Sequence, residues 1–204
     1  MEKVKPKTQK RAYHHGDLYE TLIRTAEKWI QDRGMEAFSL RACAKAAGVA
    51  HSAPGHYFKD VSEILTEIAA RGFERLHAKI EEQKRKAPKE SLLYNVCFAY
   101  VSFAMETPKL FPLIFHSDRV DRGQERFQRA GELAFRELAL AIDPDKTQRQ
   151  KNYDKLLFVW SQIHGLAMLS IDGPMVPVGG NRKGLDIAPI QKSIRTLVSL
   201  LETW

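Results

Sequence analysis

The sequence predicts an all-α protein of about nine helices, arranged in two parts. Apolar residues recur at spacings of three and four along most of the chain, and the alternating pattern of a half-buried strand is nearly absent. The 204 residues are 44% hydrophobic and 28% charged, which suits a folded protein with a sizeable apolar core. Aromatic residues become frequent after a charge-rich break at residues 81–90. We therefore expect a small N-terminal unit followed by a larger helical bundle.

Start and stop signals place the first two helices. Asp17 and Glu20 have the spacing of a capping box, so we expect the first helix to begin at Asp17 and to end at Gly34. Ser39 is the expected N-cap of a second helix that stops at Gly48. A further short helix is expected to follow within about three residues.

The larger part begins with a long helix, for which Asp60 and Glu63 form another capping-box pair. The last helix carries apolar residues at spacings of four, three and four. This stripe has two interpretations, because it either belongs to the core of one chain or forms half of a dimer interface. Its members are Ile190, Ile194, Leu197 and Leu201.

The positive charge of the chain is concentrated at its N-terminus. The net charge is +7 and the isoelectric point is about 9.4. Residues 1–16 hold five Lys or Arg against one Glu, whereas residues 17–60 hold six basic and six acidic residues. A short basic arm suits the phosphate backbone of a nucleic acid. A solvated, disordered terminus is the alternative interpretation.

Composition argues against a membrane or secreted protein. The longest uncharged runs, residues 91–105 and 156–171, are shorter than the roughly 20 residues that a membrane-spanning helix needs. No apolar segment follows the first lysines, so we expect no secretory signal. Cys43 and Cys97 lack metal or redox spacing. We expect a cytoplasmic protein with neither a cofactor nor a membrane partner.

The stretch "SLRACAKAAGVAHSAPGHYF", residues 39–58, predicts a helix-turn-helix. A small-residue helix ends at Gly48-Val49, and a short polar helix begins at about His51. In this motif the second helix enters the major groove of DNA, where short polar side chains reach base edges. Pro54 is tolerable there because it falls near the first turn of the helix. We expect His51, Ser52 and His56 to face the bases.

The chain resembles the tetracycline-repressor (TetR) family of bacterial transcription regulators. The resemblance in the N-terminal part rests on Phe38-Ser39-Leu40-Arg41, Ala44, Ala47-Gly48-Val49 and Phe58. A second match, about a hundred residues away, is the "VWSQIHGLAML" segment. It is similar to the branch whose C-terminal domain is named for a Trp-His-Gly signature, here Trp160, His164 and Gly165.

This resemblance implies a homodimeric, ligand-responsive repressor that binds double-stranded operator DNA. It implies a DNA-binding domain at residues 1–60 and a regulatory and dimerisation domain at residues 61–204. The expected DNA-binding residues are Lys10, Arg11, Ser39, Arg41, His51, Ser52, Ala53, Gly55, His56, Tyr57 and Lys59.

Three positions depart from the family pattern. The family usually has a tyrosine where Gly55 stands, a histidine where Tyr57 stands and a lysine where Val61 stands. The tyrosine and lysine typically bind DNA phosphates, so their loss weakens the expected affinity. The alternative function is therefore a helical small-molecule-binding protein, or an enzyme, that has lost DNA binding.

Aromatic residues in the larger part predict a binding pocket for an apolar or aromatic effector. A sensor pocket needs an apolar cavity with few polar groups. The same residues also suit a plain core, and His164 is either a core histidine or a polar group of the pocket. The expected ligand-binding residues are Tyr94, Phe98, Phe111, Phe115, Trp160, His164 and Met168.

The sequence gives no sign of catalysis or of a bound metal. Ser161 and His164 lie three residues apart, but no glycine-flanked nucleophile elbow is present. The histidines show no ligand spacing, and the "GGNRKG" segment lacks the ending of a phosphate-binding loop. We expect neither an enzyme nor a metalloprotein.

Overall fold

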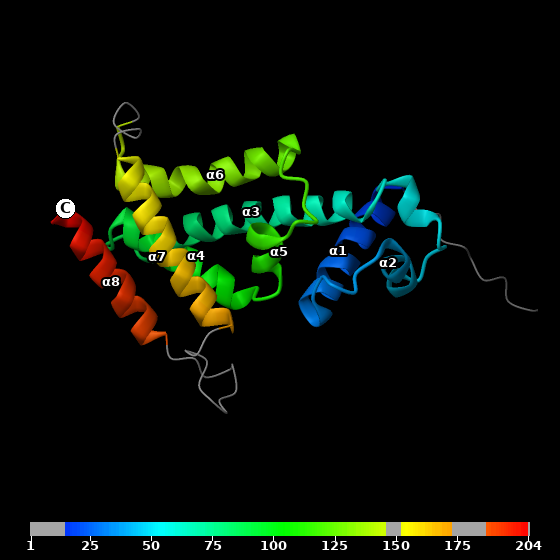
Figure 1. Ribbon diagram of the computed structural model, residues 1–204, viewed down its shortest axis with the longest axis horizontal. Coiled ribbons are helices and arrows are strands. Elements are labelled where there is room, and N and C mark those ends of the chain that lie inside the picture. Colours follow the sequence, from blue (N-terminus) through cyan, green and yellow to red (C-terminus); the bar gives the residue numbers. More distant parts are fainter. Residues whose placement is uncertain (1–14, 146–151, 173–186, 204) are drawn as a thin grey trace, which may run out of the picture.

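The computed structural model describes residues 15–145, 152–172 and 187–203, and these residues form eight α-helices and one 3₁₀ turn (Figure 1). No strand occurs among them, which confirms the all-α prediction. The elements are α1 (His15–Arg33), α2 (Leu40–Ala47), η1 (Ala53–His56), α3 (Val61–Lys86), α4 (Leu92–Glu106), α5 (Leu110–His116), α6 (Glu125–Ile142), α7 (Tyr153–Asp172) and α8 (Ala188–Glu202).

The N-terminal unit consists of α1, α2 and η1. The Ser39 hydroxyl accepts a hydrogen bond from the Ala42 amide at 3.1 Å, which confirms Ser39 as the N-cap of α2. The helix ends at Gly48, whose φ of 69° lies in the left-handed region that favours glycine. Cys43 is fully buried, so α2 presents its apolar side to the core of the unit.

The prediction for the start of α1 was wrong. The helix begins at His15, so Asp17 lies inside its first turn rather than at the cap. Glu20 instead binds Arg71 of α3, at 2.8 and 2.7 Å. The Glu20 carboxylate therefore belongs to a tertiary ion pair, whereas its spacing from Asp17 predicted a capping role at the start of the helix.

The C-terminal bundle is built on α3. Figure 1 shows α6 lying alongside α3 and α8 at the end farthest from α1 and α2, while α7 packs chiefly against α4. Glu74 pairs with Arg126 near the start of α6, and Lys84 pairs with Glu137 near its end. The two helices therefore run in the same direction. The expected charge-rich break is shorter than predicted, because α3 continues through residues 81–86.

The apolar stripe of the last helix belongs mainly to the core of one chain. Ile190 and Ile194 are 1% exposed and Leu197 is 8% exposed, while Leu200, outside the stripe, is 57% exposed. The stripe packs chiefly against α4. Any dimer contact made by α8 must therefore use the neighbouring face.

Gly72 marks the closest approach of α3 to α5. A Cβ atom at this position would lie 2.4 Å from Cδ1 and 2.9 Å from Cγ1 of Ile114, which is fully buried. A packed core resists such a shift of a side chain. The glycine therefore sets how closely α5 lies against the long helix.

We expect Gly72→Ala to lower the free energy of unfolding, measured by urea denaturation. Overpacking costs about 1–3 kcal/mol, and the better helix propensity of alanine returns at most about 1 kcal/mol. Gly55→Ala is the matched control, because a Cβ there meets nothing within 4 Å. Equal stability of the two variants would contradict this account of α3 and α5.

Candidate DNA interface and regulatory cavity

The second element of the helix-turn-helix is a four-residue 3₁₀ turn rather than an α-helix. The amides of Ala53, Gly55 and Tyr57 each bond the carbonyl three residues earlier, at 2.9, 3.1 and 3.0 Å. Pro54 has no amide hydrogen to donate, and glycine has low helix propensity. These two residues explain why the polar segment stops after a single turn.

This turn exposes most of the polar side chains expected to contact DNA. His51, Ser52, His56 and Lys59 are exposed, as are Arg41 on α2 and the backbone of Gly55. All of these residues are therefore accessible to a partner.

The other expected DNA-binding residues have different surroundings. Ser39 is half-buried and caps α2, while Ala53 is 8% exposed and belongs to the core of the unit. Tyr57 is half-buried, with its ring 5.9 Å from that of Tyr19. Lys10 and Arg11 lie outside the described residues.

An apolar cavity of about 20 Å³ lies between α3, α4, α6 and α7. Two of the predicted ligand-binding residues, Phe115 and Trp160, belong to its wall. Sequence reasoning missed Tyr100 and Phe135, because helical spacing does not reveal which apolar residues border a void. The full lining is Phe73, Leu76, Ile80, Val96, Tyr100, Phe115, Ala134, Phe135, Leu138, Trp160 and Ile163.

The remaining predicted ligand-binding residues do not line this cavity. Phe111 and His164 lie just behind the wall, with their rings stacked at 5.5 Å. Tyr94 stacks on Phe98 at 5.9 Å and lies beneath Arg195 of α8. Met168 is half-buried and does not border the cavity.

His164 joins a chain of polar groups beside the cavity. The Tyr100 hydroxyl lies 2.7 Å from His164 Nδ1, and His164 Nε2 lies 3.0 Å from His116 Nε2. Burial, and then the charge of His116, lowers the pKa of His164, while burial raises the pKa of Tyr100. A neutral imidazole has one donor and one acceptor nitrogen, which matches these two contacts.

The indole N–H of Trp160 is buried and has no hydrogen-bond partner. It is close enough to the Tyr100 hydroxyl to counteract part of the burial effect on the pKa of that group, yet it lies outside hydrogen-bonding geometry. A buried donor without a partner is costly, so such groups are uncommon in folded proteins.

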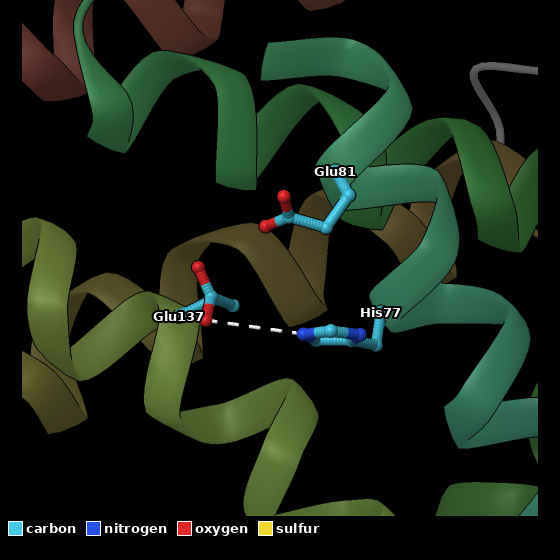
Figure 2. Close-up of side chains that lie close together, drawn as sticks. All are labelled: His77, Glu81 and Glu137. Atoms are coloured by element: carbon cyan, nitrogen blue, oxygen red, sulfur yellow. Dashed lines mark ion pairs between the residues drawn. The ribbon is translucent and has the colours of Figure 1, made fainter. Parts of the chain in front are cut away.

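Three potential metal ligands converge between α3 and α6 (Figure 2). One ligand atom from each of His77, Glu81 and Glu137 lies within 4.8 Å of the others. Lys84 already binds both carboxylates, at 2.6 Å from Glu81 and 3.1 Å from Glu137, and its hydrogen bond lowers the pKa of Glu81. A cation would have to displace this lysine, so we assign the group to ion pairing between the helices.

Contacts from residues on both sides of α5 join the bundle to the helix-turn-helix unit. The Arg119 guanidinium donates hydrogen bonds to the carbonyls of Met35 and Phe38, the latter at 3.1 Å. Lys109, just before α5, donates to the Asp32 carbonyl at 2.6 Å. Arg119 therefore holds, through hydrogen bonds, the turn that immediately precedes the Ser39 cap of α2.

An open groove of about 540 Å³ lies on the outer face of α7 and α8. Leu169 and Leu200 line it and are 45% and 57% exposed, and Gly165 adds a position without a side chain. None of the helices in the described ranges is long and apolar enough to cross a lipid bilayer.

A helix-turn-helix unit followed by a helical bundle defines the class of the protein as a helical transcription regulator. Residues 22–68 match the family described as "Bacterial regulatory proteins, tetR family", and residues 93–185 match "Tetracyclin repressor-like, C-terminal domain". The chain belongs to the TetR family of transcriptional regulators. Its assignment to the Trp-His-Gly branch stays a prediction.

Two solved structures share the fold. A protein of unknown function from Rhodococcus sp. RHA1 is 25% identical, with a TM-score of 0.71 over 94% of this chain and 97% of that one. A candidate regulatory protein, SCO4313, is 18% identical, with a TM-score of 0.69 over 93% of this chain and 98% of that one. No curated protein matches the chain significantly.

We expect Arg119→Met to lower affinity for operator DNA at least fivefold in a gel-shift titration. Loss of its two hydrogen bonds frees the turn that orients α2. Arg122→Met is the matched control, because Arg122 donates only to Phe115 of its own segment. Equal DNA affinities for the two variants would show that the bridge to the helix-turn-helix has no part in binding.

Proposed function

We propose that this regulator is a ligand-responsive repressor, which binds operator DNA as a two-fold dimer and releases it when a small apolar molecule occupies the aromatic cavity. The observation that carries the proposal is the position of α5. Phe115 at its end borders the cavity, and Arg119 four residues later holds the helix-turn-helix. One short segment thus touches both sites.

The energetic demand on this link is modest. A tenfold loss of DNA affinity requires about 1.4 kcal/mol of coupling between the two sites. A ligand supplies it only by binding more tightly to the arrangement that fits DNA poorly. Enlargement of a cavity of about 20 Å³ displaces Phe115, and α5 has little room to absorb the shift because Gly72 packs directly against Ile114. The displacement is therefore passed on to Arg119.

The DNA interface is proposed to be the face that carries His51, Ser52 and His56. Gly55 departs from the family pattern, but the absence of a Cβ lets the backbone of the turn approach a phosphate closely. Lys59, which is exposed at the end of the turn, supplies a cation beside it. The basic arm at residues 1–11 adds contacts that are independent of sequence.

We expect specific binding to a roughly palindromic site upstream of the protein's own gene, located by footprinting. Replacing both His51 and His56 by Ala should weaken that complex at least tenfold, because base-edge contacts are lost.

Deleting residues 1–11 should instead flatten the slope of log affinity against log salt concentration. Lys192→Gln, an exposed change on α8, is the control.

The two parts of this experiment decide between the competing functions. An unchanged salt slope would show that the arm does not touch DNA. Complete absence of DNA binding would favour the alternative, a helical ligand-binding protein that has lost its DNA contacts. A retained footprint with increased transcription would identify an activator rather than a repressor.

The dimer is proposed to form through the outer face of α7 and α8. This face combines exposed leucines with small polar side chains, and self-complementary patches of this kind suit a two-fold axis. A dimer also places two recognition elements about 34 Å apart, which matches successive major grooves.

We expect Leu200→Glu to convert the dimer to folded monomers in sedimentation velocity runs, because it places a charge at the centre of an apolar contact. Leu133→Glu is the matched control, since Leu133 is 41% exposed on α6, away from the groove. Circular dichroism of both variants checks that each is folded. A dimeric Leu200→Glu protein would place the interface elsewhere.

A further inference from the structure

The described residues contain two buried side-chain donors without a partner, the indole N–H groups of Trp29 and Trp160. They differ in their surroundings. Trp29 lies in the helix-turn-helix unit, where the Arg33 guanidinium covers its ring at 4.2 Å. Trp160 borders the aromatic cavity of the bundle. Of these two residues, only Trp160 lines that cavity.

The Trp160 N–H requires an acceptor, because an indole nitrogen only donates. The other polar group of the cavity wall is the Tyr100 hydroxyl, which bonds His164 and lies near the indole without forming a hydrogen bond to it. The remaining wall is apolar and holds no charged side chain. An ion in this cavity would lose its hydration without gaining a counter-charge, so the cavity selects a neutral molecule.

The size of the cavity limits the molecule further. About 20 Å³ accommodates a single water molecule, so a larger ligand needs side chains to move. Phe115, Phe135 and Trp160 are half-buried and form the part of the wall nearest the solvent. These aromatic side chains would have to rotate to admit a ligand, and the space beside them suits a compact molecule.

We propose that the ligand of this cavity is a compact neutral molecule with an aromatic or alicyclic body and one hydrogen-bond acceptor, of the ketone or ester class, which accepts from the Trp160 N–H. This inference rests on the proposed function for its regulatory meaning. The predicted chemistry of the ligand does not depend on that function, because it concerns only what the cavity binds.

The test uses two probes of nearly equal size, acetophenone and ethylbenzene, which differ by a carbonyl group. Their affinities for the full-length protein are measured by isothermal titration calorimetry. Trp160→Phe should weaken acetophenone about tenfold and ethylbenzene less than twofold, since only the carbonyl loses its donor. Trp29→Phe, which removes the other unpaired N–H, should leave both affinities unchanged.

An independent readout uses the unaltered protein. In nitrogen-15 NMR spectra, acetophenone should shift the Trp160 indole N–H resonance downfield, and ethylbenzene should leave its hydrogen bonding unchanged. This measurement keeps the test decisive if Trp160→Phe fails to fold.

Three outcomes would overturn the inference. Equal weakening of both probes by Trp160→Phe would assign Trp160 a packing role alone. An indole resonance that does not move at saturation with acetophenone would show that the ligand carbonyl accepts no hydrogen bond from the Trp160 N–H. Failure of both probes to bind the unaltered protein would show that the cavity does not open for compact rings.

The regulatory proposal fails separately. Acetophenone could bind with the expected dependence on Trp160 and yet leave the affinity for operator DNA unaltered. In that case the proposed ligand chemistry is correct, and the cavity is not a sensor.

Discussion

The ion pairs of Arg71 fix the helix-turn-helix unit to the long helix α3, and the geometry of both sites follows from this constraint. Arg71 donates two hydrogen bonds to Glu20 of α1 and one to Glu67 of its own helix. Glu67 is 5% exposed, and a second cation, Arg126 of α6, lies 3.3 Å from it. A buried carboxylate without its cations would be strongly destabilising, so α1, α3 and α6 are held together at one point.

A single rigid helix then relates the DNA interface to the regulatory bundle. Helix α3 binds α1 through Arg71 and Arg75, and the same helix packs against α4 and, along most of its length, against α6. The helix is continuous from Val61 to Lys86, so one element carries contacts with both the N-terminal unit and the bundle. The contact of Arg119 with the carbonyls before α2 provides a second connection between the bundle and the helix-turn-helix.

The bundle is closely packed around α3, and the aromatic cavity is a local exception. Gly72 brings α3 and α5 into close contact. Lys84 binds Glu81 and Glu137, the two carboxylates drawn between α3 and α6 in Figure 2. Trp160, whose N–H has no hydrogen-bond partner, lines this cavity. A local violation of good packing and hydrogen bonding inside an otherwise consistent core is what a binding site requires.

The sequence by itself determined the all-α class, the Ser39 and Asp60 caps and the helix-turn-helix, because periodicity and capping are local properties. It misplaced the start of α1, and it did not predict that Glu20 binds Arg71 of α3. Only the tertiary structure decided that Leu197 is core and Leu200 is surface, that Tyr100 borders the cavity and that Arg119 reaches the helix-turn-helix. These features depend on how helices cross, and residues far apart in the chain set the crossing angles through side-chain packing.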